Sequence, residues 1–368
     1  MIGVLTLLQL FLGLQTQLPA EDGTSRETET AIATIVDRPS TTSTDTPLFT
    51  TPDILTTKCQ TVFSVTSEIF ELSTRHLPEQ FCSINENCPP LEVNRWDASR
   101  WQRSDIDTAL QYEDKPTIVY VHGNFMERNN TLERVRILDS YLKKQATEDY
   151  RLLLFSWPSQ RERKPLRDIY ENDEVAEDQS MYLAWILRQL RNQSRVSVLG
   201  FSFGARCATA ALHLDAGGTI PGLRFGLNHS EFNQAQRMPY HLGLIAPAVD
   251  KNWLLPNGRY GKATSNINDF VNMYNSRDPV LRRYKFIDRI TRPIAGGFVG
   301  FDGIGDPRIT SPLGSQIKVK QYNCGGIIGT THSEKSYFGE CPYFRVMIDH
   351  LLWNHDQNDA SDTNASCR

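Results

Sequence analysis

The sequence has no strong excess of either charge and no second long apolar segment. Its 39 Lys and Arg residues nearly balance 43 Asp and Glu residues, for a formal net charge of −4. That balance provides no basic surface of the kind that binds nucleic acid, so no nucleic-acid partner is expected. After the first 14 residues, no stretch approaches the length of a membrane-spanning helix. No internal repeat is apparent, and Cys82 and Cys88 have no second cysteine pair at zinc-ligand spacing, so a structural zinc site has little support.

Apolar and aromatic residues are plentiful enough for a large folded core. Apolar residues make up 39% of the 368 residues, with 17 Phe, 13 Tyr and 6 Trp. A chain of this composition is not globally disordered, and its length fits one large or two ordinary domains.

The two ends differ in composition from the rest. Met1 to Leu14 form an apolar run that suits the hydrophobic region of a signal peptide but is short for a membrane span. We therefore expect a signal peptide over residues 1–20 and a secreted or periplasmic protein. No Lys or Arg precedes the run, whereas a signal peptide usually begins with a positively charged region. If the run is not cleaved, it would instead anchor the chain at a membrane. Residues 21–58 are rich in Thr, Ser and Pro and are expected to form a disordered stalk, and residues 355–368 are expected to form a flexible polar tail. The folded domain is then 59–354.

Seven cysteines occur, and several are expected to pair in an exported protein. Three of them cluster in one early segment, and Cys324 and Cys341 form a second group, so bridges are expected within each group, although connectivity does not follow from spacing. Cys207, among alanines, is expected to be a small buried hydrophobe and not a nucleophile. The seven are Cys59, Cys82, Cys88, Cys207, Cys324, Cys341 and Cys367.

Apolar runs typical of buried strands alternate with helical or irregular stretches. This alternation predicts an α/β fold with a mostly parallel sheet and helices on both faces. Helices are expected at 131–146 and 173–192, and two further strands at 69–74 and 91–95 are expected to give an antiparallel leading edge. The runs are 117–121, 152–156, 196–199, 242–245, 270–274 and 317–322.

The pentapeptide Gly200-Phe201-Ser202-Phe203-Gly204 lies between the apolar run 196–199 and a stretch of small residues. This is the strand, turn and helix that a nucleophile elbow requires, in which glycines two residues either side of the serine let strand and helix approach. A bare G-x-S-x-G is a weak signal by itself, and its setting strengthens it. We therefore predict Ser202 as the nucleophile.

A serine nucleophile needs a histidine base and a carboxylate that orients the base. Asp278 follows the run 270–274 and His332 follows the last run, 317–322, which gives the chain order Ser, Asp, His. Asp250, one strand earlier, is the rival acid. Asp278 is favoured because the acid usually follows the second strand after the elbow strand.

An acyl-transfer enzyme also needs two N–H groups that face the developing oxyanion. One donor is expected directly after the nucleophile, at Phe203. The other is expected in the loop His122-Gly-Asn-Phe, at Asn124 or Phe125. His122 is interpreted as a structural marker of this loop and not as a second base.

Together, the His122-Gly-Asn loop, the elbow around Ser202, Asp278-Pro and His332 resemble the α/β-hydrolase superfamily. The resemblance implies a three-layer αβα sandwich around a sheet of about eight strands, and hydrolysis of ester or related acyl bonds without a cofactor or metal. Shorter motifs, among them Phe155-Ser-Trp-Pro and Asn275-Ser-Arg-Asp-Pro, resemble a branch of mainly bacterial hydrolases of undefined substrate. The His-Gly-Asn loop departs from the glycine run of many esterases.

Two functions of different class follow. The first is a serine hydrolase, esterase- or lipase-like, that acts on a small-molecule or lipid-like acyl substrate; a triad alone does not separate esters from amides. The alternative is an inactive binding or scaffold protein at the cell surface. Trp253, in the irregular stretch 250–269, is a candidate for the lining of an acyl pocket, although core packing is the commoner role of such a residue.

Overall fold

The computed structural model describes residues 65–77, 89–159, 173–223, 239–288, 290–306, 308–310 and 314–354. The expected signal peptide, stalk and C-terminal tail lie outside these residues, as do Cys59, Cys82, Cys88 and Cys367. Their assignments remain predictions.

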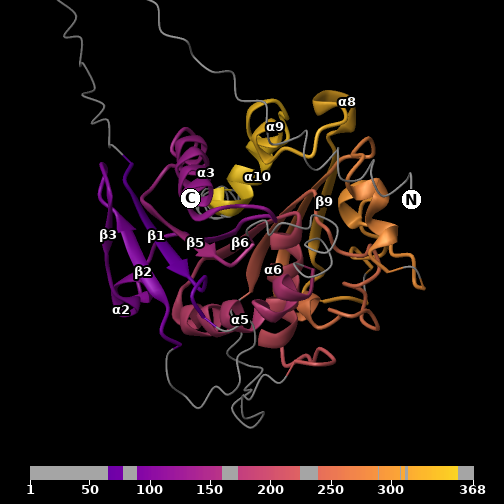
Figure 1. The fold of residues 1–368 in the computed structure, drawn as a ribbon, viewed down its shortest axis with the longest axis horizontal. Coiled ribbons are helices and arrows are strands. Elements are labelled where there is room, and N and C mark those ends of the chain that lie inside the picture. Colours follow the sequence, from indigo (N-terminus) through magenta and orange to yellow (C-terminus); the bar gives the residue numbers. More distant parts are fainter. Residues whose placement is uncertain are drawn as a thin grey trace, which may run out of the picture. The chain divides into compact units, whose positions relative to one another are not determined.

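A nine-stranded, mostly parallel sheet forms the centre of the described part (Figure 1). Its strands lie in the order β3-β2-β1-β5-β4-β6-β7-β8-β9, and every pair from β1 to β9 is parallel. The α/β fold with a parallel sheet predicted from the sequence is confirmed. The strands are β1 (Ser67–Ser73), β2 (Glu92–Trp96), β3 (Trp101–Arg103), β4 (Thr117–Val121), β5 (Tyr150–Ser156), β6 (Val196–Phe201), β7 (Tyr240–Ile245), β8 (Ile267–Tyr274) and β9 (Lys318–Asn323).

The central strands are buried on both faces. All residues of β4, β5, β6 and β7 are buried, which explains why these segments are nearly continuous apolar runs without alternation. The last strand, β9, lies at the edge and is only partly buried. Its lysines, Lys318 and Lys320, suit an edge strand, because charged side chains there discourage pairing with another chain.

The leading edge differs in part from the sequence expectation. β2 pairs antiparallel with β1 and with β3, but β1 itself runs parallel to β5, with Ser67 opposite Tyr150. The antiparallel part is therefore confined to β2 and β3. The sheet has nine strands, not about eight, because β3 adds a three-residue strand at this edge.

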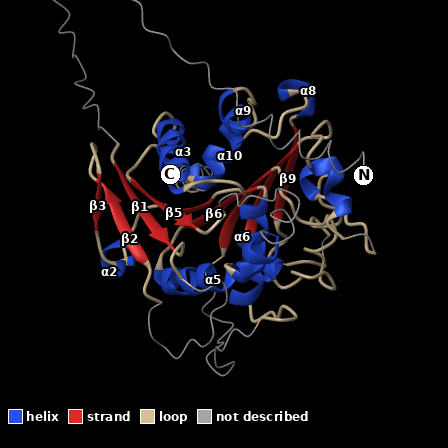
Figure 2. Ribbon diagram, viewed as in Figure 1, coloured by secondary structure: helices blue, strands red, loops and turns tan. Residues whose placement is uncertain are grey.

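Helices cover the sheet on both sides (Figure 2). Helices α5 and α6 lie on one side, while α3 and α10 lie on the other, which gives the three layers that the sequence predicted. No helix among the described residues has the length and apolar character needed to cross a membrane. The α-helices include α2 (Ile106–Leu110), α3 (Arg128–Leu142), α5 (Ser180–Gln189), α6 (Phe203–Asp215), α7 (Gly296–Val299), α8 (Gly325–Ile328), α9 (Glu334–Gly339) and α10 (Phe344–Leu351), and 3₁₀ turns cover Leu190–Asn192, Ala263–Asn266 and Leu281–Phe286. Residues 173–178 are also helical.

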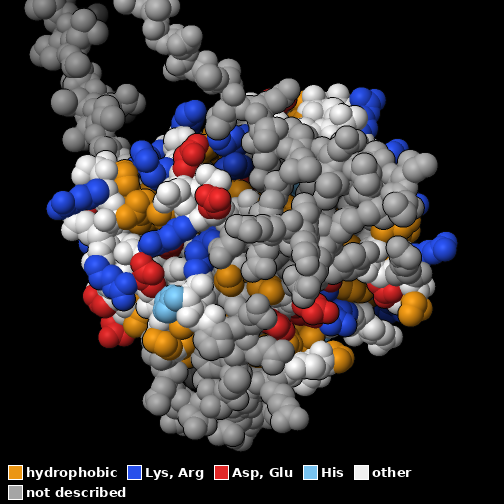
Figure 3. All heavy atoms as spheres, in the orientation of Figure 1, with side chains coloured by type: hydrophobic (Ala, Val, Ile, Leu, Met, Phe, Trp, Pro, Cys, Tyr) orange, Lys and Arg blue, Asp and Glu red, His pale blue; other side chains and the backbone are white. Residues whose placement is uncertain are grey.

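Charged side chains of both signs are interspersed on the visible face of the described residues (Figure 3). Glu68 of β1, for example, pairs with Lys115 at 2.7 Å and with the buried Arg151 at 3.0 Å. This mixture agrees with the near-balanced net charge of the sequence.

Candidate active site

Ser202 lies at a sharp turn between β6 and α6. Its backbone has φ 53° and ψ −118°, a positive φ that is rare for a residue with a side chain. Hydrogen bonds hold this conformation, because the Ser202 N–H donates to the Ile245 carbonyl at 3.1 Å, and its carbonyl accepts from the Ala248 N–H at 3.1 Å. The end of β7 thus fixes a strained turn that presents the Ser202 side chain above the sheet edge.

The glycines beside Ser202 allow strand and helix to approach closely. A Cβ atom at Gly200 would lie 2.5 Å from the Cα of Ala205, and one at Gly204 would collide with the carbonyl oxygens of Val121 and His122. Any larger residue at Gly204 would force the elbow helix away from the loop that follows β4.

A continuous chain of hydrogen bonds links the three residues predicted from the sequence. The Ser202 Oγ lies 3.0 Å from the His332 Nε2, and the His332 Nδ1 lies 2.5 Å from the Asp278 Oδ2. The three side chains come from loops after β6, β9 and β8, so they meet at the carboxyl edge of the parallel strands. Asp278 is fully buried, while Ser202 keeps 6% of its surface exposed.

The orientation of the Asp278 carboxylate is fixed by its own loop. Its Oδ1 accepts the N–H groups of Val280 at 2.8 Å and Leu281 at 3.1 Å, which leaves Oδ2 to accept from His332. The rival acid, Asp250, has a different role, since its two oxygens accept the N–H groups of Asn252 and Ile294, each at 2.9 Å. Asp250 therefore braces two loops.

Asn275, which the sequence analysis did not assign to the site, positions the histidine loop. Its Nδ2 donates to the carbonyls of Gly329 at 2.9 Å and Thr331 at 3.0 Å, and its Oδ1 accepts the Arg277 N–H at 2.8 Å. The fully buried Asn275 side chain thus joins the acid loop to the residue that precedes His332. Its sequence signal is its place three residues before Asp278, at the start of the motif Asn275-Ser-Arg-Asp-Pro.

The loop after β4 lies against the elbow. A Cβ at Gly123 would lie 2.6 Å from the Phe201 ring, which places this loop beside the nucleophile turn. The Phe125 N–H donates to the Asn124 Oδ1 at 2.9 Å, and Phe125 has a positive φ of 57°. The Asn124 Nδ2 is buried and has no hydrogen-bond partner among the described residues. Phe203 opens α6, where the first backbone N–H groups have no acceptor within the helix.

The sequence model of the alpha/beta hydrolase fold matches residues 116–217, from the start of β4 to just beyond α6. This stretch contains both the loop at Asn124 and the elbow at Ser202. The chain has the α/β-hydrolase fold. No curated protein and no solved structure matches it. The superfamily fold supports a hydrolase-type function for this α/β-hydrolase.

His122 of this α/β-hydrolase is a neutral structural residue. Its Nε2 accepts the Trp157 N–H at 3.2 Å, its Nδ1 donates to the Gly123 carbonyl at 2.8 Å, and its ring stacks on Trp157 with a centroid separation of 5.4 Å. Burial lowers the pKa of His122 well below its usual range. Both ring nitrogens are engaged in shaping the loop, so His122 is not placed to act as a second base.

Arg75 joins the ends of two strands to the loop that contains His122. Its Nε donates to the Ser156 Oγ at 2.9 Å and its Nη2 to the Met126 carbonyl at 3.0 Å. Burial lowers the pKa of Arg75 to about 10, so the guanidinium stays charged at neutral pH. The ends of β1 and β5 and the loop after β4 are thereby held in one arrangement.

Glu334, also missed from the sequence, anchors the other side of the histidine loop. It lies two residues after His332 at the start of α9 and is buried. The Tyr120 hydroxyl donates to its carboxylate at 2.9 Å, and Arg134 pairs with it at 3.0 Å. Burial raises the pKa of the Glu334 carboxyl. An acidic residue so close to the predicted base is the one sequence signal that could have indicated it.

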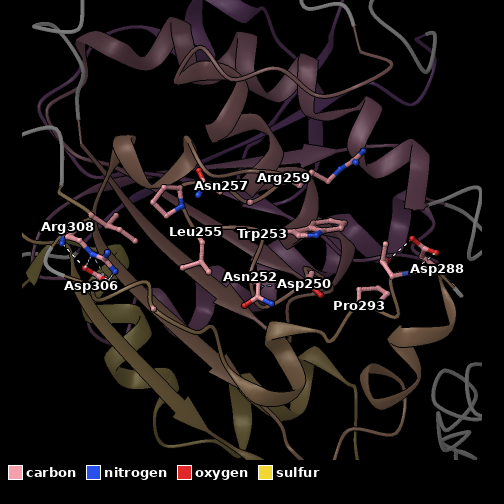
Figure 4. A pocket seen from close by; sticks show the side chains of 15 residues that line it. Asp250, Asn252, Trp253, Leu255, Asn257, Arg259, Asp288, Pro293, Asp306 and Arg308 are labelled. Atoms are coloured by element: carbon pink, nitrogen blue, oxygen red, sulfur yellow. Dashed lines mark hydrogen bonds and ion pairs between the residues drawn. The ribbon is translucent and has the colours of Figure 1, made fainter.

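A cavity of about 1070 Å³ is lined by residues from the segments that follow β7 and β8 (Figure 4). Asp250, Trp253 and Arg259 are among its lining residues, whereas Ser202, Asp278 and His332 are not. Two arginines contact the Trp253 ring, with the Arg206 guanidinium 4.9 Å and the Arg259 guanidinium 5.5 Å from the ring centroid. Trp253 is thus held in place by its neighbours at the cavity wall. Within the described ranges, no group of three or more His, Cys, Asp or Glu side chains is arranged to hold a metal ion.

Proposed function

We propose that this α/β-hydrolase is a serine hydrolase that cleaves carboxylic ester or related acyl bonds through Ser202, His332 and Asp278. The observation that carries the proposal is the hydrogen-bond chain, 3.0 Å from the Ser202 Oγ to the His332 Nε2 and 2.5 Å from the His332 Nδ1 to Asp278. This arrangement is the one in which a serine hydroxyl becomes a nucleophile at neutral pH.

The Asp278 contact determines which nitrogen of His332 acts as the base. A carboxylate only accepts hydrogen bonds, so the proton of the neutral imidazole resides on Nδ1 and points toward Asp278. The Nε2 lone pair then faces the Ser202 Oγ. As Oγ attacks the substrate carbonyl carbon, His332 takes the hydroxyl proton and Asp278 stabilises the imidazolium.

Hydrogen-bond donors on the side of the elbow stabilise the negative charge that develops on the carbonyl oxygen of the substrate. The Phe203 N–H supplies one, at the first turn of α6. The loop after β4 supplies the other through Asn124, whose buried Nδ2 lacks a partner among the described residues. Phe125 is the weaker choice, because its N–H already donates to the Asn124 side chain.

The reaction then proceeds in two stages. His332 returns its proton to the leaving oxygen as the tetrahedral intermediate collapses, which leaves an acyl group on Ser202. Water, activated by the same Nε2, attacks the acyl carbon and frees the serine. Apart from the substrate and water, the groups in this sequence all come from the chain.

The proposed substrate is a small-molecule or lipid-like acyl compound, and the shorter motifs favour the branch of bacterial hydrolases of undefined substrate. The apolar run at Met1 to Leu14 and the stretch 21–58 lead us to propose an exported enzyme. N-terminal sequencing of the mature protein tests this location, since a start near Glu21 is expected and an intact Met1 would favour a membrane anchor.

A series of p-nitrophenyl esters of increasing acyl length tests the activity. The wild-type enzyme should release p-nitrophenol with a burst followed by slower turnover, because an activated ester acylates the serine faster than water removes the acyl group. Ser202→Ala should abolish both phases, whereas Ser140→Ala, the same change at an exposed helical position whose hydroxyl donates to Ile137, should not. Activity retained by Ser202→Ala would contradict the mechanism. An inactive but folded wild-type protein would favour the binding-protein alternative.

A further inference from the structure

Two buried cysteines lie at the two ends of the segment that carries His332. Cys324 directly follows β9, and Cys341 follows α9. Their sulfur atoms lie 2.7 Å apart. This separation is about 0.7 Å more than the roughly 2.0 Å of a disulfide bond, so the two backbones already have the spacing that a bridge needs. The other cysteine in the described part, Cys207, is buried within α6.

We propose that Cys324 and Cys341 are joined by a disulfide that closes the segment around His332 and holds the imidazole within reach of Ser202. The first half of this proposal, the covalent link, is independent of the activity. The second half, its effect on the imidazole, rests on the proposed function.

A covalent link would add to the restraints that Asn275 and Glu334 place on the segment between the two cysteines. This segment contains Gly325, Gly326 and Gly329, the last with φ +68°, and its helix α8 has only four residues. Glycines leave many backbone conformations open in the absence of other contacts. His332 lies near the middle of the segment, eight residues after Cys324 and nine before Cys341.

One end of the proposed bridge is bonded to a strand of the sheet, and the other is bonded to a helix that packs on the sheet. The Cys324 N–H donates to the Tyr274 carbonyl at 2.7 Å, which fixes it to the end of β8 beside the Asp278 loop. The Cys341 carbonyl accepts the Phe344 N–H at 3.0 Å at the start of α10, a helix that packs on β7 and β8. A bond between the sulfurs would therefore join two fixed points and confine the His332 loop between them.

The bond forms by thiol–disulfide exchange with an external disulfide, for which oxidised glutathione serves in the test. Hydrogen bonding to the Cys324 thiol lowers the pKa of Cys341, which favours the thiolate that attacks. The Cys341 thiolate displaces one glutathione thiolate and forms a mixed disulfide. Cys324 then loses its proton and displaces the second glutathione, so two thiols are oxidised and one disulfide is reduced to two thiols. An export route would supply such an oxidising environment.

Peptide mapping tests the link directly on the full chain. The protein, folded with oxidised glutathione, is denatured in iodoacetamide without reductant and digested with trypsin. Cleavage after Lys320, Lys335 and Arg345 separates Cys324 and Cys341 onto two peptides, 321–335 and 336–345, which stay joined only if the sulfurs are bonded. We expect one linked species that disappears on reduction, while Cys207 is carbamidomethylated. Alkylation of both cysteines, or a link from either one to another cysteine, would overturn the pairing.

Serine variants test the effect of the bridge on catalysis. Because both sulfurs are buried, reductant reaches the folded protein slowly, and substitutions are the cleaner perturbation. Cys324→Ser, Cys341→Ser and the double variant should each lower kcat by the same factor, between about 10-fold and 100-fold, with a smaller change in KM. Equal effects are expected because each variant removes the same bond. The rate of fluorophosphonate labelling of Ser202 should fall in parallel.

Cys207→Ser is the matched control. Like the other two substitutions, it places a serine hydroxyl at a buried position, so it should lower the melting temperature. It should leave kcat unchanged well below that temperature. A double Cys324/Cys341 variant with wild-type kcat would overturn the positioning role even if the linked peptide is found. Failure of the proposed function would appear differently, as a linked peptide in a protein whose Ser202→Ala variant has unchanged activity.

Discussion

The substitution Asp278→Asn separates the electrostatic role of the carboxylate from its shape. The Asp278 Oδ1 accepts two backbone N–H groups, from Val280 and Leu281, and an amide can accept them only with its oxygen. The amide nitrogen of the variant must therefore face His332. A donor at that position requires an acceptor on the His332 Nδ1, which moves the ring proton to Nε2.

With the proton on Nε2, His332 donates toward the Ser202 Oγ and cannot remove its proton. An amide in place of the corresponding carboxylate costs about 10⁴-fold in kcat where this tautomer change has been the cause. We expect a loss of that size here, which corresponds to about 5.5 kcal/mol of transition-state stabilisation. The fold should be preserved, because the buried hydrogen bonds to the loop are kept.

The assay is steady-state hydrolysis of a p-nitrophenyl ester by both proteins at pH 7, alongside thermal melts. Asp250→Asn is the control, since Asp250 accepts only from the N–H groups of Asn252 and Ile294 and should leave kcat within a few-fold of wild type. Near-wild-type kcat for Asp278→Asn, or a large loss for Asp250→Asn, would refute the assignment of the acid.

Three further predictions concern stability. Glu334→Gln leaves the mostly buried Arg134 cation without its carboxylate and should lower the free energy of unfolding by about 3 kcal/mol in urea, whereas Glu133→Gln, in an exposed pair with Lys335, should change it little. Gly204→Ala puts a Cβ onto the carbonyl oxygens of Val121 and His122, so we expect little soluble folded protein by size-exclusion chromatography; a wild-type yield would contradict the packing at the elbow. Burial lowers the pKa of His241 to about 3, whereas in the unfolded chain its value is about 6.5, so below pH 6.5 only the unfolded state binds this proton. The free energy of unfolding should therefore decrease as the pH is lowered, by up to about 1.4 kcal/mol per pH unit. His241→Phe keeps the ring against Trp353, at 3.5 Å between centroids, and should flatten that slope between pH 6.5 and 4.5; an unchanged slope would assign it to other groups.

The sequence predicted the parallel part of the sheet well because burial on both faces leaves a direct compositional signal. Strand β4 has the same bounds, Thr117 to Val121, as its apolar run. The short strand β3 was missed because Trp101-Gln-Arg has no apolar run and exists by pairing with β2. The parallel pairing of β1 with β5 depends on contacts between residues about 80 positions apart, which no local pattern encodes.

The residues of the site likewise fall into those that the sequence predicted and those that it did not. Chain order and the elbow motif pointed to Ser202, Asp278 and His332, and the structure places them within hydrogen-bond distance. The contacts that hold these three residues in place join positions that are far apart in the sequence. Glu334 meets Tyr120 across 214 positions, and Asn275 reaches Thr331 across 56, so these roles follow only from the folded arrangement.

The most direct test of the account is labelling of the purified, folded protein with a fluorophosphonate probe, followed by mass spectrometry of the tryptic peptides. We expect a single adduct on Ser202 in the wild-type protein. Labelling should be much weaker in Asp278→Asn and absent in Ser202→Ala. An adduct on another serine, or no adduct in protein that melts cooperatively, would contradict the assignment of Ser202 as an activated nucleophile.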